Sequence, residues 1–287
     1  MEMRKNLEIA KSSWKLTFKT LREYPRISVP FVFSALAEVF FLIILYYAPR
    51  YPFSAILAPP IKTFVGEAYL HYPLNFILLP RLFYFAKVFV WFTMGICAWA
   101  VSSNMVSQVQ EGRFLPSIAG SFNRVIRRYP ALFLFALSIF ILSLVIFKLP
   151  QFLVMKLYFL PRGKYFTLQS FSFISFFITI AVEALLIYIV PSIIIERQSF
   201  FGALKRTWAL SKEIYMPTLA IILIPRLLEM GVFFLKQKLP LIMTKTFPEI
   251  TLWVLGADIV VSFLTNLIVI TLITDLFLIK QGVEKEI

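Results

Sequence analysis

The sequence predicts an all-α membrane protein, a polytopic bundle of six transmembrane helices in three repeated hairpins with interfacial amphipathic helices. Apolar residue types make up 60% of the 287 residues and charged types only 15%, whereas soluble domains are about 45–50% apolar and about 25% charged. One soluble core could not bury this excess, so the bilayer is the expected solvent. Six stretches are long and apolar enough to cross about 30 Å of hydrocarbon, and basic residues mostly flank them.

The six expected spans follow the apolar stretches in chain order. They cover about 28–48, 83–107, 129–148, 168–195, 215–235 and 252–279. The fourth and the sixth exceed the roughly 20 residues that a spanning helix needs, so tilt or an interfacial end is expected. The connections are too short and too apolar for a soluble domain, so residues 1–287 are expected to form a single integral membrane domain.

The distribution of Lys and Arg between the connections predicts the orientation. The N-terminus, the 108–128 and 196–214 connections and the C-terminus together carry 17 of these residues, and the connections on the other side carry 10. Because cytoplasmic segments are enriched in Lys and Arg, both termini are expected in the cytoplasm, with the chain in the cell (inner or plasma) membrane. The inverted orientation is the alternative.

Three segments of the chain share one layout and predict an internal repeat. The units cover about 1–107, 108–195 and 196–287. Each begins with a basic amphipathic segment, reaches a tyrosine near the membrane (Tyr24, Tyr129 or Tyr215) and continues through two spans. The second and third units align most fully, since Tyr129 and Tyr215 lie 86 residues apart while Glu111 and Glu196, each after an even-numbered span, lie 85 apart.

The segment that opens each unit has the pattern of a helix lying in the headgroup plane. Over residues 7–22 the apolar side chains share one helix face and the cations form a row on the opposite side. The apolar face comprises Leu7, Ala10, Trp14, Phe18 and Leu21. The cations of the three units expected to contact lipid headgroups are Lys11, Lys15, Lys19, Arg22, Arg124, Arg127, Arg128, Lys205 and Arg206. These segments either anchor each hairpin or form a docking surface for a lipid headgroup or a cytoplasmic partner.

Charged residues inside the spans are the best candidates for a functional site, because each costs about 2.5–3.5 kcal/mol at the centre of a membrane helix. The candidate intramembrane polar site consists of Glu38, Glu183, Arg226, Glu229 and Ser143. Arg226 and Glu229 are spaced i, i+3 and are expected to pair on one helix face. Lys87, Asp258 and Asp275 lie nearer the ends of the expected spans and carry less weight.

The repeat places three of these polar groups at one depth. Glu38 lies 14 residues after Tyr24, and Glu229 and Ser143 each lie 14 residues after the equivalent tyrosine. This register predicts a quasi-threefold ring around an inner polar space. Two interpretations stay open: the groups fix helix packing by pairing with one another, or they line a water-accessible cavity that binds a cation, a proton or a cationic headgroup. Pro225 could break the fifth span and expose backbone carbonyls there.

The sequence lacks the residues that catalysis and cofactor binding need. It contains no G-x-S-x-G elbow, no H-E-x-x-H helix and no Walker loop, so no enzymatic activity is expected. One cysteine, Cys97, and one histidine, His71, cannot build a zinc site or a disulfide, and no cofactor or metal is expected. The net charge of +14 comes without a basic block interleaved with aromatics, which favours anionic lipid headgroups over nucleic acid as partners.

The end of the fourth span carries a sequence pattern of its own. The span closes with Pro191-Ser192-Ile193-Ile194-Ile195-Glu196, and Ala203, Leu204, Lys205, Arg206 and Trp208 precede the fifth span. This pattern, about 30 residues with Thr207 in place of the usual Ser, resembles one found in prokaryotic six-span membrane proteins of unknown function. It is also similar to the membrane domain fused to some glycerophosphodiester phosphodiesterases, whose acidic metal-binding motifs are absent here. The resemblance implies a six-span fold and no particular activity.

Two functions fit these observations. The first is an accessory or scaffold protein that binds lipids or another membrane protein, favoured by the basic interfacial helices and the lack of catalytic motifs. The alternative is a transporter or channel for a cation, a proton or a small solute, favoured by the acidic residues at matching depth. The first is the function that we expect.

Overall fold

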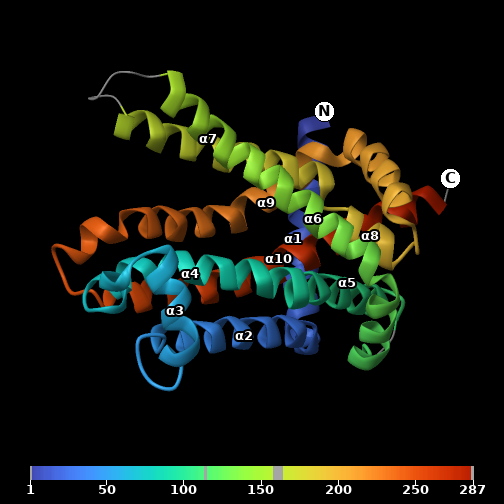
Figure 1. Ribbon diagram of the computed structural model, residues 1–287. Coiled ribbons are helices and arrows are strands. Elements are labelled where there is room, and N and C mark those ends of the chain that lie inside the picture. The colour runs from blue at the N-terminus through green and yellow to red at the C-terminus, as the bar shows by residue number, and fades with distance from the viewer. Residues whose placement is uncertain (1, 113–114, 158–163, 286–287) are drawn as a thin grey trace. The chain divides into compact units, whose positions relative to one another are not determined.

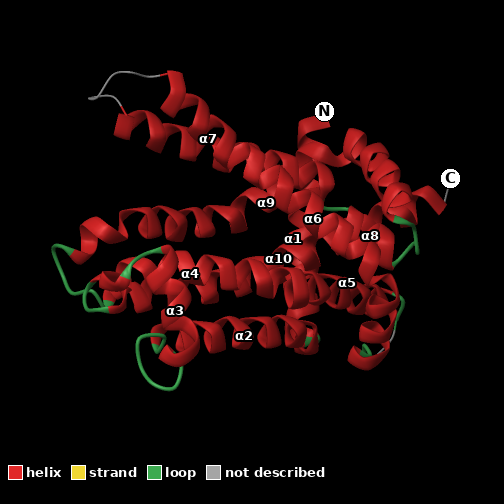
Figure 2. Ribbon diagram, viewed as in Figure 1, coloured by secondary structure: helices red, strands yellow, loops and turns green. Residues whose placement is uncertain are grey.

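The computed structural model describes residues 2–112, 115–157 and 164–285. These residues form helices joined by turns and short loops (Figure 2), with no strand among them, which confirms the all-α prediction. Six of the described segments are long and apolar enough to cross a membrane. They are Pro25–Tyr46, Leu74–Gln110, Ile118–Lys148, Phe171–Ile194, Phe200–Met243 and Ile250–Gly282. The chain is therefore a multi-pass membrane protein, and the six-span prediction is confirmed.

The chain folds into two compact units, and each takes its residues from separate stretches of sequence. Unit 1 comprises Met1–Ser28, Trp99–Arg226 and Ile268–Ile287, and unit 2 comprises Val29–Ala98 and Leu227–Leu267. The boundaries fall inside the helices α5, α9 and α10 (Figure 1), which cover Ile96–Gln110, Phe200–Met243 and Ile250–Lys285. These helices therefore contribute residues to both units. The threefold repeat stays a prediction.

Unit 2 packs α2 (Val29–Tyr46) against α4 (Leu74–Val90), and the two helices run side by side in Figure 1. The remaining local elements are α3 (Ser54–Phe64), the 3-10 helix η2 (Glu67–Leu70) and the π-helix η3 (Trp91–Gly95). Pro30 stands in the first turn of α2, where the missing N–H is harmless because that amide would have no partner in the helix. Apolar side chains of α4, α9 and α10 form the core: Phe76, Leu79, Phe83, Met243, Leu255 and Ile259.

Unit 1 is built around a buried aromatic pair. Its elements are α1 (Glu2–Glu23), the 3-10 helix η1 (Pro25–Ser28), α6 (Ile118–Leu157), α7 (Lys164–Leu186), α8 (Ile189–Ile194) and parts of α5, α9 and α10. Tyr188, just before α8, stacks on Phe277 of α10 with ring centroids 6.3 Å apart, and both side chains are fully buried. The Tyr188 hydroxyl is hydrogen-bonded to Thr218 of α9, so the polar end of the buried ring has a partner. The pair therefore joins α8, α9 and α10.

The three expected membrane junctions differ in backbone geometry. α1 ends before Tyr24 and Pro25, because a proline has no N–H with which to continue the helix. By contrast, α6 is continuous through Tyr129. α9 bends just before Tyr215, at Ile214, whose φ of −121° and ψ of 19° are not helical. The segment of the second unit is therefore continuous with its span, that of the third unit is separated from its span by a kink, and that of the first unit is a separate helix.

Two prolines in the spans have different consequences. Pro225 does not break the fifth span: it lies inside α9, whose non-helical residue is Ile214, because a membrane helix can absorb a proline at the loss of one backbone hydrogen bond. Pro191 does coincide with a break, since α7 ends at Leu186 and a short turn precedes α8. In a continuous helix the ring of Pro191 would clash with the carbonyl of Ile187.

Candidate functional site

One face of α1 is a stripe of hydroxyl side chains that packs against the rest of unit 1. Ser13, Thr17 and Thr20 are spaced by four and three residues, so they share a helix face, and all three are buried. The Thr17 hydroxyl donates a hydrogen bond to Oδ2 of Asp275 at 2.8 Å. Gln110 donates to Oδ1 of the same carboxylate at 3.0 Å. These bonds join α1 to α10, and the end of α5 to the same carboxylate of α10.

The other two faces of α1 point away from the protein. Phe18 is 56% exposed, and its ring stacks on that of Trp14 with centroids 5.5 Å apart. The predicted basic row is exposed as well, and it comprises Lys11, Lys15, Lys19 and Arg22. The helix is therefore three-sided, with a hydroxyl face toward the protein, an aromatic face uncovered by protein and a row of cations. The sequence pattern identified the last two faces and missed the first.

The remaining predicted headgroup contacts divide into two groups. Arg127 and Lys205 are exposed and Arg128 is half-buried. Arg124 instead donates a hydrogen bond to the side-chain oxygen of Asn104 at 2.6 Å. Arg206, similarly, places Nε 3.2 Å from Oε1 of Glu196. Arg124 and Arg206 are thus held by protein groups, which leaves the other seven cations as the better candidates for lipid contact.

A buried polar network at the end of α5 was not anticipated. Asn104 and Gln108 lie one turn apart and both donate hydrogen bonds to the hydroxyl of Ser121 on α6, at 2.7 and 3.0 Å. The side-chain oxygen of Gln108 accepts the backbone N–H of Ser117 at 2.9 Å. This network closes the α5–α6 connection. The available signal was the i, i+4 spacing of two amide residues in a stretch without charges.

The candidate intramembrane residues of unit 1 form one ion pair and one local bond. Arg226 on α9 binds both carboxylate oxygens of Glu183 on α7, with Nε 3.0 Å from Oε2 and Nη2 bonded to Oε1. This two-pronged geometry is the strongest that a guanidinium forms with a carboxylate. Ser143 donates to the carbonyl of Phe140, one turn earlier in its own helix, at 3.0 Å. The pair supports the packing interpretation for Glu183 and Arg226.

The candidate residues of unit 2 belong to a larger cluster centred on a lysine and an aspartate. The Lys87 ammonium lies 2.9 Å from Oδ2 of Asp258, 2.9 Å from the hydroxyl of Ser262 and 3.6 Å from Oε2 of Glu38. On the other side of the aspartate, Lys236 lies 2.7 Å from Oδ1. Asp258 therefore bridges two ammonium groups and joins α4, α9 and α10.

Glu229 completes this cluster. Its carboxylate accepts a hydrogen bond from Thr265 and lies within electrostatic range of Lys87 and Lys236. Together with Glu38 and Asp258, Glu229 places three carboxylates around the two ammonium groups. Glu38 and Glu229 thus do share one site, within unit 2. Ser143 and the Glu183–Arg226 pair belong to unit 1, and the predicted threefold ring stays a prediction.

Lys87 lies deeper inside its membrane segment than the sequence predicts. Lys87 was placed near the start of an 83–107 span, but α4 begins at Leu74, so the lysine lies well inside the membrane segment. Lys236 was placed in a connection, whereas α9 continues to Met243. Both helices extend beyond the apolar stretches that predicted the spans. A cation can lie inside a membrane helix when a carboxylate of another helix lies beside it.

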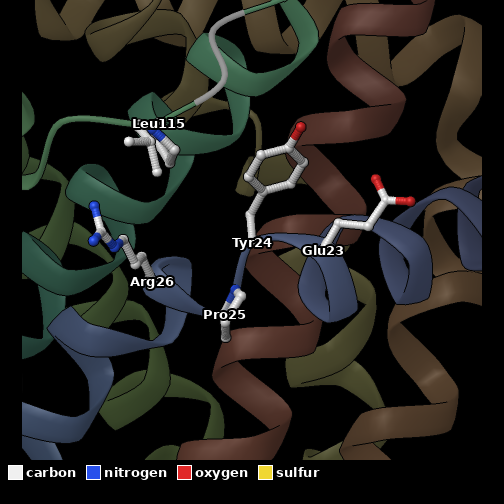
Figure 3. A pocket seen from close by; sticks show the side chains of 6 residues that line it. Glu23, Tyr24, Pro25, Arg26 and Leu115 are labelled. Carbon is white, nitrogen blue, oxygen red and sulfur yellow. The ribbon is translucent and has the colours of Figure 1, made fainter.

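A pocket of about 390 Å³ opens where α1 meets the first span. Its lining comprises Glu23, Tyr24, Pro25, Arg26, Leu115 and Pro116. Figure 3 shows the Tyr24 ring between the side chains of Arg26 and Glu23, with Leu115 on the same side of the ring as Arg26 and the Glu23 carboxylate directed away from them. The pocket therefore combines a cation, a carboxylate and an aromatic ring.

Comparison of the chain with protein-family models, with curated proteins and with solved structures gave no match. The resemblance of the Pro191–Ser211 region therefore stays a prediction. Among the described residues, no three His, Cys, Asp or Glu side chains gather as a metal site would require.

Asp258→Asn is expected to destabilise the protein strongly, because it leaves Lys87 and Lys236 without their shared counter-ion in a mostly buried position. Breaking a buried ion pair from one side costs about 3–5 kcal/mol. Thermal unfolding in detergent, followed by a dye that reacts with Cys97 as it becomes accessible, measures the change. Glu67→Gln is the control: it removes the exposed partner of Lys62, 2.8 Å away, and should leave the unfolding temperature unchanged. Similar unfolding temperatures for the two variants would contradict the central role of Asp258.

Proposed function

We propose that this chain is a membrane scaffold without enzymatic activity, which binds anionic lipid headgroups through α1. Another membrane protein is the alternative partner for the same surface, and nucleic acid is not a partner. The observation that carries the proposal is the three-sided arrangement of α1. Its hydroxyl face is fixed to the protein by Thr17 and Asp275, so the basic row stays exposed in a defined position.

Several cations and an aromatic pair contribute to this binding. Each Lys or Arg near an anionic membrane surface contributes about 1 kcal/mol, and four of them lie along one side of α1. The aromatic pair of the exposed Phe18 and the half-buried Trp14 can enter the boundary between headgroups and acyl chains, as aromatic rings of interfacial helices do. Because α1 is already folded against the protein, lipid binding does not bear the cost of ordering the helix.

The proposed orientation places α1 and both termini in the cytoplasm, with the chain in the cell membrane. This placement agrees with the excess of Lys and Arg in that set of segments. The cytoplasmic leaflet carries most of the anionic lipid in many membranes. The basic row would therefore lie against the leaflet that attracts it.

This orientation predicts which of two exposed lysines is accessible from outside intact cells. In a Cys97→Ser background, Lys62→Cys should react with a membrane-impermeant maleimide, whereas Lys15→Cys should react only after permeabilisation. Both lysines are exposed, so intrinsic accessibility does not separate them. Labelling of Lys15→Cys in intact cells, with Lys62→Cys protected, would establish the inverted orientation.

Replacing Lys11, Lys15, Lys19 and Arg22 together by Gln is expected to lower the preference for anionic lipid several-fold, because the charges of α1 that attract anionic headgroups are removed. The preference is the ratio of the association constants of spin-labelled phosphatidylglycerol and phosphatidylcholine, measured by electron paramagnetic resonance in bilayers that contain the full chain. The matched control replaces four exposed cations outside α1, Arg50, Lys62, Arg81 and Lys245, and should retain most of the preference. An unchanged ratio in the α1 variant would refute the proposal.

A second function, transport of a proton or a cation, is favoured by one observation in unit 2. Oε2 of Glu38 is buried without a hydrogen-bond partner among the described residues. Its nearest cation, Lys87, lies 3.6 Å away. A buried carboxylate oxygen that lacks a hydrogen bond can take up a proton or contact a monovalent cation. Against it, the lysines neutralise most of the charge that a cation would need.

Under the scaffold proposal, proteoliposomes with the wild-type chain should show no proton or cation flux above protein-free vesicles. The deciding variant is Glu38→Gln/Glu229→Gln, which removes two carboxylates of the cluster. Its control, Glu67→Gln/Glu249→Gln, removes two carboxylates outside the membrane segments. Flux in the wild type that disappears in the first variant and persists in the second would establish transport and displace the scaffold proposal.

A further inference from the structure

We propose that the pocket beside Tyr24 binds the headgroup of a zwitterionic phospholipid that carries a phosphate and a primary ammonium, as phosphatidylethanolamine does. The inference deepens the proposed function, since it rests on lipid binding at the α1 end of the protein. It names a second, stoichiometric lipid site with a chemistry that differs from that of the basic row.

The pocket is formed by the backbone break that separates α1 from the first span. The N–H of Tyr24 bonds to the carbonyl of Thr20 at 2.8 Å as the last turn of α1, and Pro25 then starts the 3-10 helix η1. Ile27 is fully buried beneath this turn. Its carbonyl accepts a hydrogen bond from the hydroxyl of Ser102 on α5 at 2.9 Å. The turn is therefore held in place before any ligand arrives, which favours binding.

The size and the position of the pocket suit a lipid headgroup. Its volume of about 390 Å³ lies within the roughly 300–1,000 Å³ of small-molecule sites. The first membrane segment begins at Pro25, one of the lining residues, so the opening lies at the level where headgroups meet hydrocarbon. Leu115, which is 60% exposed, and Pro116 supply an apolar wall for the glycerol and the first acyl carbons.

The charges in the pocket match the two ends of a zwitterion. Arg26 is exposed and makes no ion pair with any described residue, so its guanidinium is available to bind a phosphate through two N–H donors. Glu23 makes one long ion pair, 4.0 Å from Lys19, and can accept hydrogen bonds from an ammonium. The face of the Tyr24 ring, between these two side chains in Figure 3, adds a cation–π contact to the ammonium.

The same chemistry disfavours the other common headgroups. An anionic headgroup such as glycerol phosphate offers nothing positive to the Glu23 carboxylate. A choline headgroup has no N–H to donate to that carboxylate, and a quaternary ammonium is usually held by a cage of several aromatic rings. Tyr24 is the aromatic residue among the lining residues that the structure describes. A primary ammonium satisfies both Glu23 and Tyr24.

Native mass spectrometry of the full chain in detergent tests this site. Phosphatidylethanolamine, phosphatidylglycerol and phosphatidylcholine with identical acyl chains are compared at the first bound lipid. We expect the first phosphatidylethanolamine to bind about tenfold more tightly than either of the others, a factor that corresponds to one charge-assisted hydrogen bond. Soluble phosphoethanolamine at millimolar concentration should not displace it if the acyl chains contribute; displacement would assign the site to free phosphoethanolamine, with the same headgroup chemistry.

Two variants distinguish a charge-matched pocket from general damage. Arg26→Gln should weaken the first adduct of all phospholipids about tenfold, whereas Glu23→Gln should weaken phosphatidylethanolamine and leave phosphatidylglycerol unchanged or tighter. A change of preference in Glu23→Gln cannot result from a loss of folding. Equal affinities of the three lipids, or an unchanged preference in Glu23→Gln, would overturn the assignment.

A third variant separates this inference from the proposed function. Lys11→Gln/Lys15→Gln removes half of the basic row and leaves every lining residue of the pocket in place. It should lower the spin-label preference for anionic lipid while it preserves the first phosphatidylethanolamine adduct. If the spin-label preference does not change and the adduct persists, lipid binding by the basic row is refuted and lipid binding in the pocket is retained. If the adduct of the wild-type chain shows no headgroup preference, the pocket fails independently of the basic row.

Discussion

A charged side chain inside hydrocarbon needs a partner from the protein, since neither water nor lipid tails can supply one. Each unit of this chain meets that requirement with residues from different helices. In unit 2, Asp258 accepts Lys87 on one oxygen and Lys236 on the other. In unit 1, Arg226 occupies both oxygens of Glu183. These ion pairs hold helices with mostly exposed apolar surfaces in one arrangement, because a shift of one paired helix would leave a charge without its partner.

The same requirement explains how α1 is attached. The buried carboxylate of Asp275 has two neutral donors, Thr17 and Gln110. Any displacement of α1 would leave one of these bonds unmade in a buried position, at a cost of about 1–3 kcal/mol. The hydroxyl stripe therefore acts as the attachment face of α1. The cations and the aromatic pair remain on the other faces, which meet lipid in the proposed function.

The two proposed lipid contacts lie along α1 and at its C-terminal end. Along α1, the basic row offers several equivalent charges and so favours anionic surfaces without selecting a particular headgroup. At the end of α1, Glu23, Tyr24 and Arg26 line a pocket of limited size with opposite charges on its two sides. The first feature depends on net charge and the second on the placement of individual groups. A scaffold that uses both would retain one lipid while it attracts many.

The sequence alone determined the all-α class, the number of spans and the cations of α1, because hydropathy and a helical period of 3.6 residues act locally and need no knowledge of neighbours. Its spacing arguments also brought Glu38 and Glu229 into one site. Only the tertiary structure decided which groups pair. Asp258 and Lys236 were undervalued, since helix length inside the membrane depends on whether a counter-ion lies on another helix. The hydroxyl face of α1 could not be predicted for the same reason. The role of Thr17 depends on Asp275, its hydrogen-bond partner 258 residues away.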